Sequence, residues 1–233
     1  GRSPCGDQPR AAAYAGSLGG IRTSAPSMHR PYYSLLLALG LGLACSRTPP
    51  GPPPPSDQAL QAELLSRVAR DQAVRDTFAE QLRATGTITP AIAASMRQVD
   101  SANLAWLKPH LRKHGFPTQS QVGKEGVQAA ALLIQHADAD PAFQAEVLPQ
   151  LEGAFRAGDV TGQEVAMLTD RVAKAQGRPQ RYGTQTTIAN GKVIFDPIED
   201  SAGVDARRAA MGLPSLAAYK AVLDSVYGRQ ASP

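Results

Sequence analysis

A proline-rich run limits the part of this chain that can fold into a packed domain. Residues 49–55 consist of six prolines and one glycine. Proline fixes φ and lacks a backbone N–H, so such a run adopts an extended polyproline II conformation and cannot join a core. We expect residues 46–56 to form a linker, either a semi-rigid spacer or a tail without that role. Residues 57–228 then form a single domain, and ~170 residues can bury a core without disulfides.

The segment before the linker has the pattern of a signal peptide. A short basic start at residues 28–30 precedes an apolar stretch at residues 35–44, which is too short to span a bilayer. Residues 28–45 therefore predict export. Residues 1–27 contain no methionine and no periodicity, and we interpret them as an upstream extension that the natural protein lacks.

The end of the signal peptide, Gly42-Leu43-Ala44-Cys45, resembles a lipobox, in which diacylglycerol is attached to the cysteine before cleavage. Gly42 stands where a lipobox usually has leucine, and ordinary signal peptidase would also accept this sequence. We expect lipidation of Cys45 and an exported protein whose partner is the membrane of the cell envelope, reached through the lipid anchor. The alternative is a soluble secreted or periplasmic protein.

Charge and cysteine usage exclude two classes of protein. The net charge is +4, and residues 1–45 contribute four arginines and one aspartate, so 20 basic face 19 acidic side chains in the remainder. This balance predicts no nucleic-acid partner. The two cysteines, Cys5 and Cys45, lie outside the domain, so we expect packing rather than disulfides to stabilise it.

The domain consists mainly of segments with helical periodicity, separated by start and stop signals. Thr89-Pro90 and Asp140-Pro141 each place a capping residue before a first-turn proline, and Thr161 with Glu164 forms a capping box. Pro109 should kink or restart the second helix. The pattern predicts helices at about 57–84, 89–115, 123–137, 140–158, 161–177, 205–211 and 214–227.

Helical periodicity stops between the fifth and sixth of these helices. The β-prone runs 182–188 and 192–195 flank Ala189-Asn190-Gly191, and Asn-Gly is typical of a tight hairpin turn. The predicted fold class is therefore mainly α, a single multi-helix domain with a small β-hairpin insertion near residues 182–196.

Two predicted helices carry polar side chains where their apolar stripes lead us to expect hydrophobic ones. Asp71 and Arg75 lie in the middle of the first stripe, and Asn103 lies in the second with Asp100 beside it. Charged groups are costly to bury unless they are paired. They form either a structural i,i+4 ion pair that fixes helix packing or a polar wall of a cleft.

Two polar stretches are candidates for chemistry. In the first, around Gln135-His136, the histidine can act as a proton acceptor, with Asp138 or Asp170 orienting it. The second, residues 178–185, offers donors and acceptors for a polar ligand. The competing interpretations are a capping or core histidine and an ordinary strand edge. The candidate catalytic residues are His136 and Asp170, and the candidate binding residues are Asp71, Arg75, Asn103, Gln135, Arg171, Gln180, Tyr182, Thr184 and Gln185.

The remaining motifs indicate no further chemistry. His110 and His114 are four apart and could hold a metal from one helical face, but no third ligand stands near them and basic residues surround them. We interpret both as solvated histidines and predict no metal and no cofactor. Serine-hydrolase elbows, His-Glu-x-x-His and phosphate-binding glycine loops are absent from the sequence.

Seven short motifs together resemble a bacterial family known only as a domain of unknown function, of the 6624 type, usually exported or lipoprotein. The resemblance covers about residues 60–220 and departs from the family pattern at Phe116, where tryptophan is usual, and at Pro109. It implies no reaction, cofactor or substrate. The motifs are Asp71-Gln72 with Arg75, Val99-Asp100 with Asn103, Gly115-Phe116-Pro117, Gln135-His136-Ala137, Leu168-Thr169-Asp170-Arg171, Gln180-Arg181-Tyr182-Gly183-Thr184-Gln185 and Gly212-Leu213-Pro214.

Two functions remain open from the sequence. The first is an envelope hydrolase or other acid/base enzyme, with His136 as base, Asp170 as its orienting partner, and Arg171, Tyr182 and Gln185 binding an unknown polar substrate. The second is a non-catalytic binding or structural envelope lipoprotein, in which the same residues fix the fold. The first hypothesis requires these residues to converge on one cleft.

Overall fold

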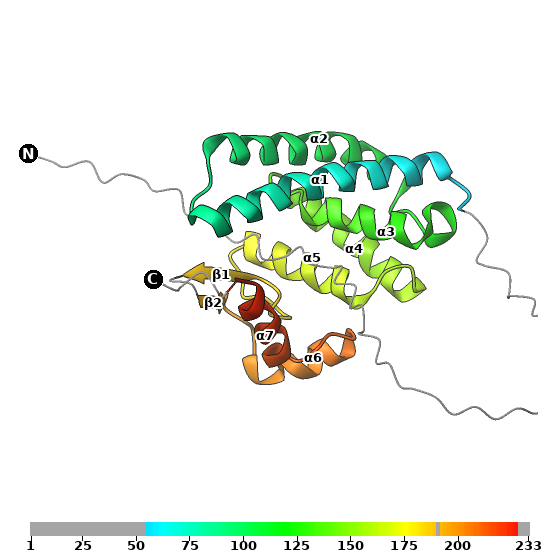
Figure 1. Cartoon of the computed structure of the whole chain (residues 1–233). Coiled ribbons are helices and arrows are strands. Elements are labelled where there is room, and N and C mark those ends of the chain that lie inside the picture. The colour runs from blue at the N-terminus through cyan, green and yellow to red at the C-terminus, as the bar shows by residue number, and fades with distance from the viewer. Residues whose placement is uncertain (1–54, 190–191, 228–233) are drawn as a thin grey trace, which may run out of the picture. The chain divides into compact units, whose positions relative to one another are not determined.

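The structure, a computed structural model, describes residues 55–189 and 192–227 and is mainly helical (Figure 1). This confirms the fold class expected from the sequence. The predicted upstream extension (1–27), the predicted signal peptide with Cys45, and the predicted linker up to residue 54 lie outside the described residues. The elements are α1 (Gln58–Thr85), α2 (Pro90–His114), α3 (Gln119–Gln135), α4 (Pro141–Ala157), α5 (Gly162–Ala175), β1 (Thr186–Ala189), β2 (Lys192–Phe195), the 3-10 turn η1 (Ser201–Gly203), α6 (Val204–Ala210) and α7 (Leu216–Tyr227).

The helix starts lie where the capping signals place them. The side chains of Asp57 and Asp140 accept hydrogen bonds from backbone N–H groups in the first turns of α1 and α4. Thr161 and Glu164 form the predicted capping box at α5. Each cap gives a partner to a backbone donor that the helix itself leaves unpaired.

The core lies among the first five helices. α1 packs against α2 and α3, α4 packs against α5, and α3 also contacts α5. Figure 1 shows α1 and α2 side by side along α3. Leu64, Leu107, Ile134, Leu151 and Leu168 represent these helices in the core, and each is at most 1% exposed.

α3 begins earlier than predicted because it contains a break. Gly123 has φ 69° and ψ 170°, a positive φ that glycine adopts without the strain a side chain brings. The break frees the carbonyls of Ser120 and Gln121, which accept hydrogen bonds from the backbone N–H groups of Ser56 and Asp57. The predicted start at residue 123 therefore coincides with the break, and one extra turn precedes it.

Two further boundaries differ from prediction. A single helix, α2, runs through Pro109, so the proline does not restart it. The hairpin pairs Thr186 with Phe195 and Ala189 with Lys192, and its turn lies outside the described residues. Residues 182–185 do not join β1, because most of their backbone N–H groups bond to side chains instead.

The C-terminal elements close the domain around a buried arginine. Arg208 of α6 is 1% exposed and donates hydrogen bonds to the carbonyls of Pro214 and Tyr182. At the start of α5, a β-carbon on Gly162 would lie 2.1 Å from the carbonyl oxygen of Met211. Only glycine fits at this contact.

None of the described helices is both long enough and apolar enough to cross a membrane.

Candidate functional site

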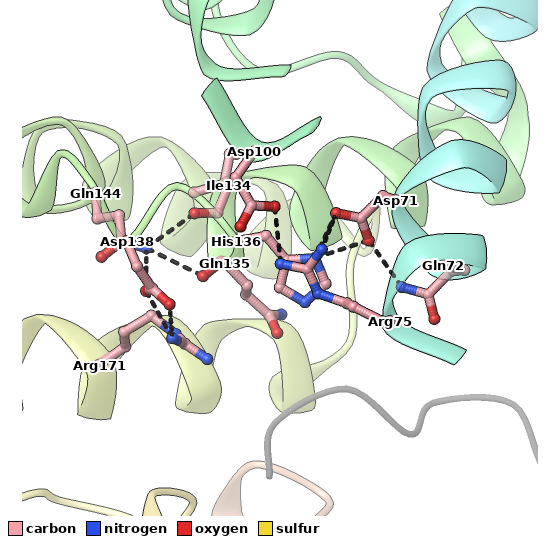
Figure 2. A network of polar contacts seen from close by, with 10 residues as sticks. All are labelled: Asp71, Gln72, Arg75, Asp100, Ile134, Gln135, His136, Asp138, Gln144 and Arg171. Carbon is pink, nitrogen blue, oxygen red and sulfur yellow. Dashed lines mark hydrogen bonds and ion pairs between the residues drawn. The ribbon is translucent and has the colours of Figure 1, made fainter. Parts of the chain in front are cut away.

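His136 lies at the C-terminal end of α3 and is almost completely buried. Its backbone N–H donates to the carbonyl of Leu132, and its side chain is 5% exposed. The ring nitrogen Nδ1 is 2.9 Å and 3.0 Å from the two carboxylate oxygens of Asp71, as Figure 2 shows. A carboxylate can only accept when ionised, so this geometry places the Nδ1 proton toward Asp71.

Arg75 connects the pair to a second carboxylate. Its Nη1 lies 2.7 Å from Oδ1 of Asp71, one helical turn earlier, and its Nη2 lies 2.9 Å from Oδ1 of Asp100 in α2. Gln72 also donates to Asp71, at 2.8 Å. The ion pair expected from the i,i+4 spacing is therefore present, and it joins α1, α2 and the end of α3. We call Asp71, Gln72, Arg75, Asp100 and His136 the histidine network.

Burial and charge set the protonation states in the histidine network. Burial raises the pKa of the Asp71 carboxyl, but hydrogen bonding and charge from His136 and Arg75 outweigh it, so this pKa lies below its ordinary value. Burial lowers the pKa of the His136 imidazole, and the charge of Arg75 adds to this effect. Burial raises the pKa of Asp100, with Arg75 opposing. We infer a neutral imidazole beside an ionised Asp71.

Side chains from α4 and α5 hold the chain just before and just after His136. Gln144 Nε2 donates to the carbonyls of Ile134 and Gln135, at 3.0 Å and 3.1 Å. Arg171 Nη1 lies 2.6 Å and 2.8 Å from the two oxygens of Asp138. Both contacts are drawn in Figure 2. The backbone on both sides of His136 is thus held by side chains from α4 and α5.

Asp170 forms a second cluster, and its partners are mainly backbone groups. Its Oδ1 accepts from the N–H groups of Arg181 and Tyr182, at 2.7 Å and 2.9 Å. Its Oδ2 accepts from both the N–H and the hydroxyl of Thr184, each at 2.9 Å. Burial raises the pKa of Asp170, and these four hydrogen bonds act in the opposite direction. We call Asp170 with residues 180–185 the loop cluster.

Gln180 and Gln185 complete the loop cluster. Gln180 Nε2 donates to the carbonyls of Gln185 and Asp196, and its Oε1 accepts from the N–H of Gln185. Gln185 in turn donates to the hydroxyl of Thr184. The polar side chains of Gln180 and Thr184 are thus used to shape the loop that leads into β1.

The predicted site residues divide into two separately hydrogen-bonded clusters, and their convergence on a single cleft stays a prediction. Asp71 and Arg75 join His136, while Arg171 and Gln135 lie at the adjoining turn. Asp170, Gln180, Tyr182, Thr184 and Gln185 belong to the loop cluster. Asn103 belongs to neither: its Oδ1 accepts from Arg67 at 3.4 Å, and its buried Nδ2 has no partner among the described residues.

The role expected for Asp170 is also corrected. Asp170 does not orient His136, because both of its oxygens are occupied by the loop from residue 181 to 184. Asp71 makes that contact instead. The neighbouring Arg171 points to Asp138, so the two adjacent residues serve different parts of the fold.

Three structurally important polar residues were absent from the predicted set. Gln144 shares a helical face with Val147 and Leu151, so the argument that identified Asp71 would have identified it too. Asp100 is three residues before Asn103 and was within reach of the same argument. Arg208 carried no signal, because a buried arginine in a short helix is indistinguishable from an exposed one in the sequence.

Two further features were sought among the described residues, a metal-binding cluster and a surface depression. Within residues 55–189 and 192–227, no group of three or more His, Cys, Asp or Glu side chains is placed to hold a metal ion. A shallow depression involves Phe116, Gln150, Gly153 and Asp159, and none of these residues belongs to either cluster.

The fold and the two clusters define a mainly helical domain with a buried carboxylate–histidine network. The chain belongs to the Family of unknown function (DUF6624), whose family model matches residues 58–232. This confirms the resemblance and its extent. No curated protein and no solved structure matches the chain.

Proposed function

We propose that this domain is an acid/base enzyme, of the hydrolase class, and that Asp71 and His136 are its proton-transfer pair. One observation supports this proposal above others. Asp71 engages Nδ1 with both oxygens, while Nε2 of the same ring has no hydrogen-bond partner among the described residues. Nε2 is not among the fully buried side-chain atoms that lack a partner, so the 5% of His136 that stays exposed can include this nitrogen. A ring held at Nδ1 and open at Nε2 is suited to proton transfer.

The proposed chemistry follows from the protonation states. A neutral imidazole accepts a proton at Nε2 from water or a substrate hydroxyl, and the ionised Asp71 stabilises the imidazolium that forms. Arg75 holds the Asp71 carboxylate in place through an ion pair of 2.7 Å. Asp71 therefore takes the orienting role that the sequence suggested for Asp170.

The polar groups near the pair support a small polar substrate, presented outside the cytoplasm. Gln135 immediately precedes the histidine and is 4% exposed, so a substrate would contact its amide only after neighbouring side chains move. The proposal that Cys45 carries a lipid anchor in the cell envelope rests on the signal-peptide pattern of residues 28–45.

A non-catalytic structural role is the second candidate, and burial favours it. Asp71 is 0% exposed and His136 is 5% exposed. Under this candidate, the only role of the pair is to fix the packing of α1, α2 and α3. In that case the network contributes stability and no turnover.

Substituting His136 with asparagine and with alanine separates these functions. Asparagine can place an amide donor near the position of Nδ1 but has nothing at Nε2, whereas H136A removes both. We expect H136N to keep more of the free energy of unfolding than H136A, while turnover falls about 100-fold or more. Turnover is measured on chromogenic esters, phosphoesters, amides and glycosides, with urea unfolding in parallel.

The structural role predicts a different pair of results. Wild-type protein then gives no more turnover than H136N on any of the four substrate classes, and both variants lose stability. That outcome would exclude the enzyme.

The lipid anchor is tested independently of the chemistry. We expect the full-length precursor, expressed in a bacterium, to incorporate a labelled fatty acid and to partition into detergent. C45A should lose both properties, and T48A, three residues after the cysteine, is the control that keeps them. Label in C45A equal to the wild type would contradict the anchor.

A further inference from the structure

Three aromatic side chains form a stack along one face of α2. Trp106, His110 and His114 follow one another at intervals of four residues. The ring centroids of Trp106 and His110 are 5.5 Å apart with the planes at 9°, and those of His110 and His114 are 4.9 Å apart at 37°. The guanidinium carbon of Arg67 lies 4.4 Å from the Trp106 ring, so the tryptophan is held in place.

The spacing of the two imidazoles fits a shared metal ion. Zinc binds histidine nitrogen at about 2.1 Å with tetrahedral geometry, which places two ligand ring centroids roughly 5 Å apart. The observed separation for His110 and His114 is 4.9 Å. Neither imidazole hydrogen-bonds to any other described residue, and His114 is exposed, so both nitrogens can turn toward an ion from solvent.

Ion pairs reduce the positive charge that would oppose metal binding here. Lys108 pairs with Asp140, and Arg112 pairs with Glu146. Lys113 is the basic residue next to His114 for which the described part of the chain shows no ion pair.

We propose that His110 and His114 form a surface site for a divalent transition-metal ion of the copper, nickel and zinc class, with water completing the coordination. Imidazole is the ligand type that these ions share. With two protein ligands the site is exchangeable rather than structural. The proposal is independent of His136 and of any catalytic role.

Trp106 supplies the test, because it is the only tryptophan in the chain and it stacks on His110. Paramagnetic Cu²⁺ bound at the pair should quench its fluorescence with one-site saturation at micromolar concentrations at pH 7.5. Zn²⁺, which is diamagnetic, should compete and restore the emission.

H114Q is the decisive variant, since residue 114 is exposed and the stack pairs Trp106 with His110. We expect H114Q to raise the half-saturating Cu²⁺ concentration at least tenfold, and H110Q to do the same. R83Q, an exposed substitution in the last turn of α1, should titrate like wild type. Circular dichroism confirms that each variant is folded.

Two results would overturn the site. One is an H114Q titration that matches the wild type, which would place the bound copper elsewhere, for example at a cysteine. The other is a half-saturation in the millimolar range in wild type. Zinc calorimetry at pH 7.5 on the same proteins should give the same tenfold ratio, and equal affinities there would also reject the proposal.

Discussion

Asp71 and Asp170 are both completely buried carboxylates, yet they are used in different ways. Asp170 accepts three backbone N–H groups and one hydroxyl from a single loop, so its two oxygens are saturated by the chain it shapes. Asp71 is bound by side chains from its own helix and by an imidazole from α3, which has another nitrogen. The loop cluster is therefore closed on itself, whereas the histidine network retains a group that can react.

The comparison teaches that burial alone does not identify a functional carboxylate. Most donors to Asp170 are backbone groups, which cannot leave without unfolding the loop. One donor to Asp71 is the imidazole of His136, a side chain that can change its protonation state. Four predictions can break or sharpen this difference.

The largest effect is expected for D170A. It leaves the N–H groups of Arg181, Tyr182 and Thr184 without their acceptor, and breaking a buried charged interaction from one side costs about 3–5 kcal/mol. Urea unfolding measures the loss, and D170N should lose less because one oxygen remains. A loss below about 1 kcal/mol for D170A would show that the loop does not depend on this carboxylate.

Substitutions in the histidine network should destabilise the domain less than D170A does, and their effects should be coupled. We expect D71N and H136N each to destabilise the domain by about 2–3 kcal/mol, with the double variant less destabilised than the sum by about 1 kcal/mol or more. The control cycle pairs D71N with T184V, from the loop cluster. Additivity in the D71N/H136N cycle would mean that the contact carries no energy.

The pH dependence of stability should come partly from His136. Its folded pKa lies below the ordinary 6.5, so the unfolded chain takes up a proton first as the pH falls. Stability should therefore decrease below about pH 6.5, by at most about 1.4 kcal/mol per pH unit from one histidine. Asp71, whose pKa lies below 3.8, adds a loss only at lower pH. Urea unfolding from pH 4 to 8 measures this slope, and H136Q should flatten it between pH 5 and 6.5; an unchanged slope would assign it to other groups.

The smallest effect is expected at the surface of the loop cluster. Arg181 pairs with Glu199 at 2.9 Å, but their side chains are 51% and 44% exposed. Solvent-exposed pairs contribute about 0–1 kcal/mol. R181Q should therefore change the free energy of unfolding by less than about 0.5 kcal/mol, because the backbone N–H that Asp170 accepts is retained. A larger change would show that the Arg181 side chain contributes part of the stability that we assign to Asp170.

Much of the fold was predictable from the sequence because its signals are local. Capping residues before first-turn prolines placed the helix starts, and Asn190-Gly191 placed the hairpin. The errors arose where tertiary contacts overrode local preference. Gly123 was predicted to start a helix. Residues 182–185 were predicted to be strand, but the N–H groups of Tyr182 and Thr184 donate to Asp170, and that of Gln185 donates to Gln180.

The site was predictable in part, for the same reason. Asp71 and Arg75 share one helix, so their spacing revealed the pair. The partner of His136 could not be derived, because which of several separated carboxylates reaches α3 depends on how the helices pack. The sequence suggested Asp170 as the partner of His136, but both of its oxygens accept hydrogen bonds from residues 181–184.

The contact at Gly162 has a consequence for how α5 is held. A β-carbon there would lie 2.1 Å from the carbonyl oxygen of Met211, so the start of α5 and the segment that follows α6 meet backbone against backbone. We expect G162A to push these two segments apart and to lower the free energy of unfolding, because a backbone carbonyl cannot rotate aside as a flexible side chain can.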